Sequence, residues 1–136
     1  MKLLATIPIL FLGLTINAQV SPSEKVLSPN KLALISHHEK ASQGECIQVT
    51  VHSEDASGHD APVTENILGS VTGAGLGFYG DSHCVNKNST FTIYARQDWG
   101  KFYYVGSKQG VFTMNITTAP SIGTLTQKVI VVAANK

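Results

Sequence analysis

The sequence is poor in charged residues, and the two signs nearly cancel. Asp, Glu, Lys and Arg make up 14% of its 136 residues, and the formal net charge at pH 7 is +1. A protein that binds nucleic acid or an anionic membrane by bulk electrostatics needs a clear basic surplus. We therefore expect neither nucleic acid nor an anionic membrane surface as a partner.

Long apolar runs are also scarce, and the one that is present lies near the N-terminus. Leu3–Leu14 follows Lys2 and precedes Ile16-Asn17-Ala18, a small-residue cleavage pattern. This order is typical of a secretory signal peptide. The alternative is a transmembrane anchor, but the run is shorter than the roughly 20 apolar residues that a span needs. We expect residues 1–18 to be cleaved and the mature chain to contain no membrane span.

Cysteine is nearly absent, since the chain has only Cys46 and Cys84. In an exported protein, two cysteines separated by a long loop most simply form a disulfide. Closing such a loop stabilises a fold by about 4 kcal/mol in the chain-entropy model. A small domain has a net stability of only about 5–15 kcal/mol. The sequence therefore predicts a Cys46–Cys84 disulfide as a main source of stability.

Helical periodicity is missing, and strand-like alternation takes its place. Cys46–His52 alternates between apolar and polar residues, as a half-buried strand does, and so do Ser89–Arg96 and Val111–Thr117. About seven or eight short strands separated by turn signals indicate an all-β sandwich or barrel. The weaker strands are expected at residues 31–36, 66–71, 101–105 and 126–133.

The domain organisation follows from composition and length. Residues 19–30 contain two Ser-Pro pairs and few apolar residues, so we expect a flexible leader there. Residues 31–136 are then one domain, because the chain is short and has no internal repeat.

Five motifs together resemble a known family. They are Gly44-Glu-Cys46, Asp55-Ala-Ser-Gly58, Gly77-Phe-Tyr-Gly-Asp-Ser-His-Cys84, Lys101-Phe-Tyr-Tyr104 and Gly110-Val-Phe-Thr-Met-Asn115. In this order they resemble the bacterial immunoglobulin-like (Big-type) domains of secreted and surface proteins, over roughly Lys31–Ala133. The resemblance implies an antiparallel immunoglobulin-like β-sandwich with the Cys46–Cys84 bridge. Such domains often occur as tandem modules of adhesins, where they act as spacers or binding platforms.

Exposed aromatic side chains are the candidate binding residues. Gln97-Asp98-Trp99-Gly100 has the composition of a turn, where a large aromatic should be partly exposed. An exposed tryptophan near tyrosines is a frequent binding hot spot. We therefore predict a binding surface from Trp99, Tyr79, Tyr94 and Tyr103. The alternative for the strand aromatics is packing in the core.

The sequence gives little support for a metal site or for an enzyme active site. Adjacent His37 and His38 would point to opposite faces of a strand. His52, His59, Asp60 and His83 are the further metal candidates, but strand spacing places His52 about 20 Å from Cys46 and so from His83. We predict no metal, no cofactor and no catalytic residue, and we expect Asp81 to shape a turn. Gly73-Ala-Gly-Leu-Gly77 is predicted as a turn, because a phosphate-binding fingerprint needs a later glycine and a following helix.

The function predicted from the sequence is binding without catalysis. We expect an exported immunoglobulin-like module that binds a protein or a glycan at the cell envelope, secreted or periplasmic. The alternative is a structural envelope protein that assembles through a sheet edge, either with a partner or with copies of itself. The remaining alternative is a small metal-binding protein or enzyme.

Overall fold

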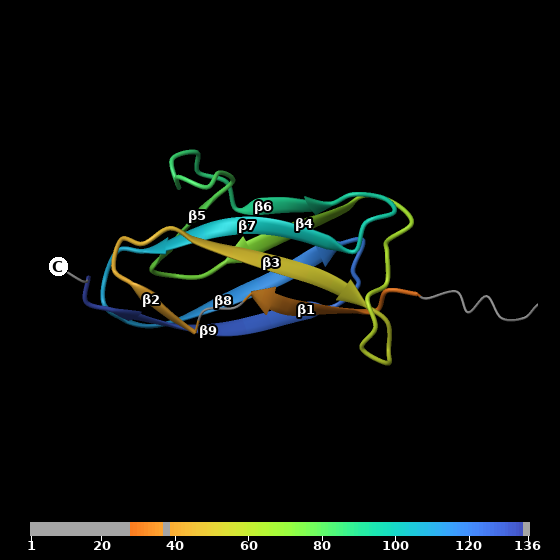
Figure 1. Cartoon of the computed structure of the whole chain (residues 1–136), viewed down its shortest axis with the longest axis horizontal. Coiled ribbons are helices and arrows are strands. Elements are labelled where there is room, and N and C mark those ends of the chain that lie inside the picture. The colour runs from red at the N-terminus through yellow and green to blue at the C-terminus, as the bar shows by residue number, and fades with distance from the viewer. Residues whose placement is uncertain (1–27, 37–38, 135–136) are drawn as a thin grey trace, which may run out of the picture.

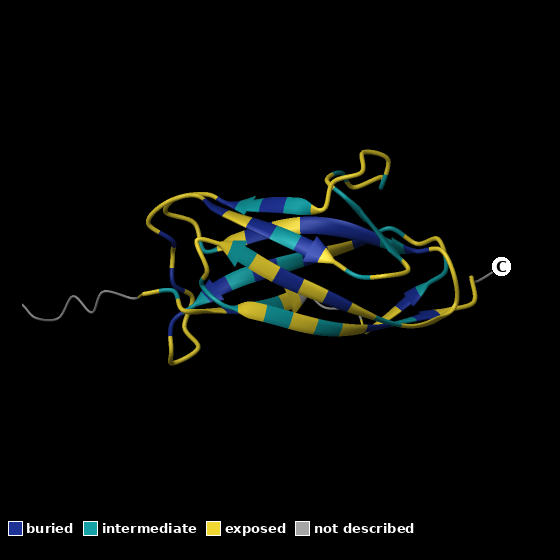
Figure 2. Cartoon of the chain, turned by 180° about the vertical axis from the view of Figure 1, so that it is seen from behind, coloured by how far each residue is buried: buried dark blue, intermediate teal, exposed yellow. Residues whose placement is uncertain are grey.

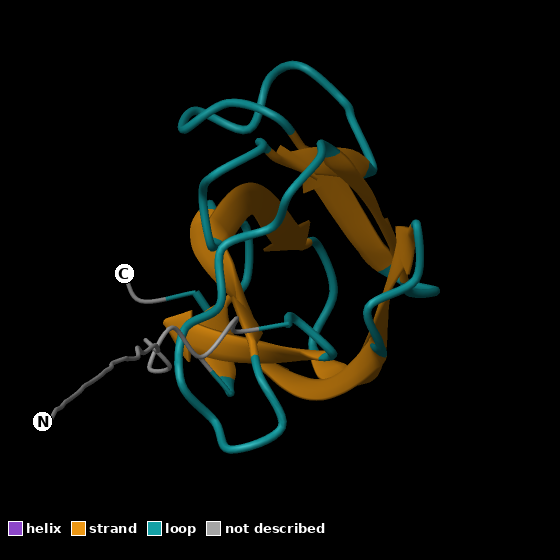
Figure 3. Ribbon diagram, turned by 90° about the vertical axis from the view of Figure 1, so that its right-hand side faces the viewer, coloured by secondary structure: helices purple, strands orange, loops and turns teal. Residues whose placement is uncertain are grey.

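The computed structural model describes residues 28–36 and 39–134, and these residues form two β-sheets packed face to face. The predicted signal peptide, most of the predicted leader, and His37 and His38 lie outside the described residues. The described part of the chain contains no helix long and apolar enough to cross a membrane. Figure 3 looks along the strands and shows the two sheets facing each other across the core.

The first sheet has four strands and the second has five (Figure 1). In spatial order, the first contains β1 (Lys31–Ser36), β3 (Ile47–Glu54), β7 (Trp99–Gly106) and β5 (Leu76–Tyr79). The second contains β2 (Lys40–Ser42), β9 (Thr124–Val132), β8 (Gly110–Ala119), β4 (Ile67–Thr72) and β6 (Thr90–Ile93). The all-β prediction and the immunoglobulin-like sandwich are confirmed.

Alternation of apolar and polar residues explains which face each strand buries. In β3, Ile47, Val49 and Val51 are buried, while Gln48 is exposed on the opposite face. In β7, Phe102 and Tyr104 are buried in the core. Figure 2 shows this alternation of buried and exposed residues along the strands. The period of two was the signal in the sequence, and it is confirmed.

The core joins the two sheets through aromatic rings. The Phe102 ring of β7 contacts Phe78 of β5 edge-on and stacks on Phe91 of β6, with centroids 6.1 Å and 5.6 Å apart. Gly69 of β4 pairs directly with Phe91, and a side chain at Gly69 would overlap the Phe91 ring. Glycine is therefore required at this position, because the ring lies flat over the backbone.

Some details differ from the prediction. The described residues form nine strands, whereas seven or eight were expected. The difference arises because β2 and β5 are too short for alternation to reveal them. The sandwich is not wholly antiparallel, since β2 pairs with β9 in parallel. Trp99 opens β7 rather than lying in a turn, because it pairs with His52 of β3. The turn lies earlier, where the Gln97 amide donates to the Tyr94 carbonyl at 2.9 Å.

The first sheet has two ends of different character. Cys46 stands just before β3, and its disulfide to Cys84 confirms the predicted bridge. We call this the disulfide end, and it includes the loop of residues 80–89. At the other end, β3 finishes and β7 starts beside the loop of residues 55–66, which we call the polar end. In Figure 1 the loop of residues 55–66 lies at the right-hand end of the sandwich, whereas the loop of residues 80–89 projects from its upper edge in the left half.

Candidate functional site

A groove of about 430 Å³ lies between β6 and the first half of β7. It forms because β5 pairs only with Tyr103–Gly106 and leaves Trp99–Phe102 without a strand on that side among the described residues. β6 is the edge strand of the second sheet. The two sheets thus each present an open strand edge to the same groove.

Gly100 brings the two strands close together at the bottom of this groove. A Cβ atom at Gly100 would lie 2.8 Å from Phe91 Cδ2 and 2.9 Å from the Thr92 carbonyl oxygen. Such contacts are too short for any side chain, so β7 can approach β6 this closely only with glycine here. The rest of the lining is polar or aromatic: Gly80, Asn88, Thr90, Phe91, Thr92, Tyr94, Gln97, Trp99, Gly100 and Lys101.

Two of the four predicted binding residues meet in this groove. Trp99 is 40% exposed at the start of β7, and Tyr94 is 58% exposed just after β6. Alternation along β7 turns Trp99 and Lys101 away from the core, because Phe102 faces into it. The groove therefore combines two accessible aromatic rings with amide, hydroxyl and ammonium groups.

The other two predicted residues lie elsewhere. Tyr103 is only 7% exposed, and its hydroxyl donates to the Gln48 side-chain oxygen at 3.2 Å. Tyr79 lies on β5, where it pairs with Tyr103 of β7, and the Tyr79 hydroxyl lies close to Gly77. Neither residue lines the groove. We therefore keep Trp99 and Tyr94 as the candidate binding residues and leave Tyr79 and Tyr103 out of the proposal.

The loop at the disulfide end forms one wall of the groove, through Gly80 and Asn88. The Asp81 carboxylate shapes this loop by accepting backbone hydrogen bonds from Asn86 at 2.7 Å and Val85 at 3.1 Å. These bonds, led by the one from Asn86, hold the pKa of Asp81 below its ordinary value. The prediction that Asp81 shapes a turn is confirmed.

The polar end contains a cluster that the sequence showed only in part. His52 Nδ1 lies 3.5 Å from Asp60 Oδ1, and side-chain ligand atoms of His52, Asp60 and Asp98 all lie within 4.8 Å of one another. Of the predicted metal candidates, only His52 and Asp60 come together. His59 instead lies 3.5 Å from Asp55. Asp98 was not predicted from the sequence, because it lies far from His52 in the chain. Asp98 reaches the cluster only because Trp99, the residue after it, pairs with His52.

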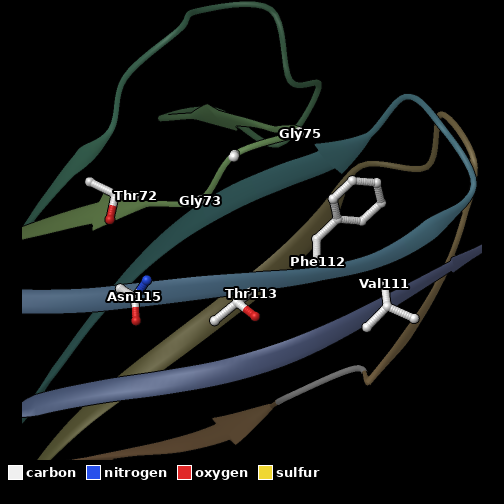
Figure 4. A pocket seen from close by; sticks show the side chains of 8 residues that line it. Thr72, Gly73, Gly75, Val111, Phe112, Thr113 and Asn115 are labelled. Atoms are coloured by element: carbon white, nitrogen blue, oxygen red, sulfur yellow. The ribbon is translucent and has the colours of Figure 1, made fainter.

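A second and wider hollow of about 700 Å³ lies on the other sheet (Figure 4). It runs from the turn at Gly73 and Gly75 to Val111–Asn115 of β8. The Phe112 ring lies against Gly75, whose φ of +86° suits glycine, and also packs against the core. The turn predicted over Gly73–Gly77 covers only residues 73–75, because Leu76 and Gly77 already belong to strand β5. We rank this hollow below the groove because Phe112 is committed to packing.

Comparisons with known proteins identify the fold. No family model matches the sequence, and no curated protein matches it. Among solved structures, the chain is similar to a β-glycosidase from Bacteroides vulgatus, with 16% identity and a TM-score of 0.55 over 76% of this chain and 14% of that one. It is also similar to a glycosyl hydrolase family 2 member from Bacteroides cellulosilyticus, with 8% identity and a TM-score of 0.60 over 80% and 15%. The chain spans about one seventh of the length of these glycosidases. At such identities the likeness shows a shared β-sandwich fold alone.

Proposed function

We propose that this chain is an exported, non-catalytic immunoglobulin-like module that binds a glycan in the groove between β6 and β7. The observation that carries the proposal is the exposure of Trp99 and Tyr94 in one groove beside Gln97 and Thr92. A sugar ring presents apolar C–H faces and hydroxyl edges. Aromatic rings cover such faces, while amide and hydroxyl side chains donate to and accept from the edges.

Export and a place at the cell envelope are part of the same proposal. The Cys46–Cys84 disulfide supports an oxidising compartment, secreted or periplasmic. The N-terminal pattern of residues 1–18 supports cleavage by the secretory route. The motif order that resembles Big-type domains supports a role in adhesion. The fold itself occurs in proteins of many functions, so the commitment to a glycan rests on the groove.

Calorimetric titration of the purified protein with polysaccharides tests the proposal. The panel contains a neutral, an acidic and an amino-sugar polymer. We expect saturable binding of at least one polymer, and loss of about tenfold in affinity in each of Trp99→Ala and Tyr94→Ala. Tyr79→Phe, at an aromatic outside the groove, is the control and should bind as the unchanged protein does.

Two results would reject a glycan ligand. One is binding that is equally tight in Trp99→Ala and Tyr94→Ala. The other is no binding to any polymer while a defined envelope protein binds in a Trp99-dependent way, which would assign the groove to a protein partner.

Assembly through a sheet edge is the second candidate. It is favoured by the stretch Trp99–Phe102 of β7, which pairs with β3 on one side but has no strand on the other side among the described residues, so an added strand could pair there. Lys101 lies within this stretch, and charged residues discourage edge pairing, so we rank assembly second. Sedimentation analysis separates the candidates: strand addition predicts concentration-dependent association together with protection of the amides of Trp99–Phe102 from hydrogen exchange.

A further inference from the structure

We propose that His52, Asp60 and Asp98 form a site for one divalent transition-metal ion, with Zn²⁺ as the best match. In tetrahedral zinc sites, nitrogen and oxygen ligands at 2.0–2.2 Å from the ion are about 3.3–3.6 Å from each other. The distance of 3.5 Å between His52 Nδ1 and Asp60 Oδ1 falls within that range. Asp98 supplies a third ligand atom within 4.8 Å of the other two, which small side-chain rotations can bring into range.

A buried nitrogen atom without a hydrogen bond points to a ligand at this place. Among the described residues, His52 Nδ1 is the one buried side-chain nitrogen or oxygen atom that has no hydrogen-bond partner. Leaving such an atom unsatisfied costs free energy, and native proteins rarely do so without a reason. A metal ion bound between His52 and Asp60 would give this nitrogen its partner.

Buried Ser53 holds the segments that carry the three side chains in place. Its amide donates to the Asp98 carbonyl at 2.8 Å, and its hydroxyl donates to the Ala61 carbonyl at 2.8 Å. The Ala61 amide in turn donates to the Ser53 carbonyl at 2.9 Å. These bonds tie the backbone of Asp98 and of Ala61, the residue after Asp60, to β3, the strand of His52. The backbone that carries the three side chains is therefore held in place before any ion binds, which is part of what a preorganised metal site requires.

The donor set selects the class of metal. Ca²⁺ and Mg²⁺ prefer oxygen ligands alone, whereas imidazole nitrogen favours Zn²⁺ and its transition-metal neighbours. One imidazole and two carboxylates match the ligand types of zinc sites. Three protein ligands leave a fourth position for water. The two carboxylates also neutralise the charge of the ion.

The site is separate from the groove but adjacent to it. None of the three residues lines the groove. His52 pairs with Trp99 across β3 and β7, and directly paired residues have Cβ atoms about 4.5–5.5 Å apart. Trp99 is the only tryptophan of the chain. Its fluorescence is therefore a local reporter, which a bound paramagnetic ion such as Co²⁺ should quench.

Zn²⁺ and Co²⁺ titrations of untagged, oxidised protein test the proposal, by calorimetry and by Trp99 fluorescence respectively. The protein carries His37→Gln and His38→Gln, so that these adjacent histidines contribute nothing. We expect one ion per chain and saturable quenching. His52→Gln, Asp60→Asn and Asp98→Asn should each weaken binding by at least about tenfold.

Two matched variants control for the loss of any histidine or any acid. His83→Gln changes an exposed histidine at the disulfide end, and Glu65→Gln changes an exposed acid in the loop of the polar end. Both should keep the affinity of the parent protein, and circular dichroism should show that all variants fold. Absence of saturable binding at millimolar Zn²⁺, or equal affinity in the three cluster variants, would overturn the proposal.

Discussion

The disulfide end and the polar end of the first sheet both use an aspartate to shape a loop. Asp81 accepts backbone hydrogen bonds from the amides of residues 83, 85 and 86. Asp55 accepts them from Ser57 at 2.8 Å and His59 at 3.0 Å. Beyond this the ends differ. A covalent bond closes the disulfide end, whereas the polar end has the buried His52 Nδ1 atom, which makes no hydrogen bond, and the exposed Trp99.

The difference indicates a division of labour along one sheet. At the disulfide end, the disulfide and the hydrogen bonds of Asp81 constrain the loop that forms a wall of the groove. At the polar end, hydrogen-bonding capacity and aromatic surface remain available for a ligand. Removal of the disulfide should therefore reduce stability first, and changes to the exposed aromatic side chains beside the polar end should reduce binding first.

Removal of the disulfide should have the largest effect. Changing both Cys46→Ser and Cys84→Ser should lower the free energy of unfolding by about 4 kcal/mol, because the unfolded chain regains the entropy of a long open loop. Chemical denaturation of the oxidised protein and of this double variant measures the difference. Hydrogen exchange should speed up most in residues 80–89.

Reductant added to the unchanged protein provides the control, since it should reproduce most of the loss without any substitution. An unfolding midpoint that does not move with reductant would show that the disulfide contributes no stability, and the contrast between the two ends would fail.

Loss of the Ser53 hydroxyl should have the next largest effect. Ser53→Ala leaves the Ala61 carbonyl without its buried donor, which should cost about 1–2 kcal/mol. Ser57→Ala changes an exposed hydroxyl in the same loop and should cost less than about 0.5 kcal/mol. Denaturant unfolding measures both. Equal stability of the two variants would show that Ser53 does not hold the polar end together.

The sequence predicted the strands whose pattern is local. Alternation placed Ile47, Val49 and Val51 on the buried face of β3, and Cys46 with Cys84 gave the bridge. The three residues of β2 carry too short a pattern to be recognised, and their parallel pairing with β9 depends on distant contacts. Local patterns therefore predicted the sandwich but not its full topology.

The candidate sites depend on pairing between distant strands, so the sequence showed them only in part. Trp99 and Tyr94 were singled out as aromatics outside a clear core pattern, and they do share the groove. The cluster of His52, Asp60 and Asp98 needs the register of β3 against β7, which brings together residues that are far apart in the sequence. No spacing in the sequence encodes that register.

Acid should weaken both aspartate loops. Backbone hydrogen bonds, led by those from Asn86 and His59, lower the pKa values of Asp81 and Asp55 in the folded state. Each carboxylate therefore stabilises the fold above the unfolded pKa of about 3.9, and this contribution is lost as the pH falls through the lower folded value. Asp81→Asn and Asp55→Asn should be less stable than the parent at neutral pH, and the gap should narrow in acid.

Urea unfolding at a series of pH values measures this gap, with Glu65→Gln as the control because Glu65 is exposed and accepts none of these bonds. A gap that stays constant down to strongly acidic pH would mean that the ionised carboxylates are not what holds the loops.

Removal of the Tyr94 ring should have the smallest effect on stability. It should also separate the binding role of the polar end most clearly from the stabilising role of the disulfide end. The ring is 58% exposed, and the backbone carbonyl that accepts from Gln97 remains in Tyr94→Ala. The free energy of unfolding should therefore change by less than about 0.5 kcal/mol, while affinity for a polysaccharide in the groove should fall by about tenfold. The double cysteine variant should show the reverse balance wherever it remains folded. A binding surface that the rest of the fold holds in place can lose one ring without unfolding. A large loss of stability in Tyr94→Ala would therefore contradict this view and would show that the ring helps to hold the sandwich together.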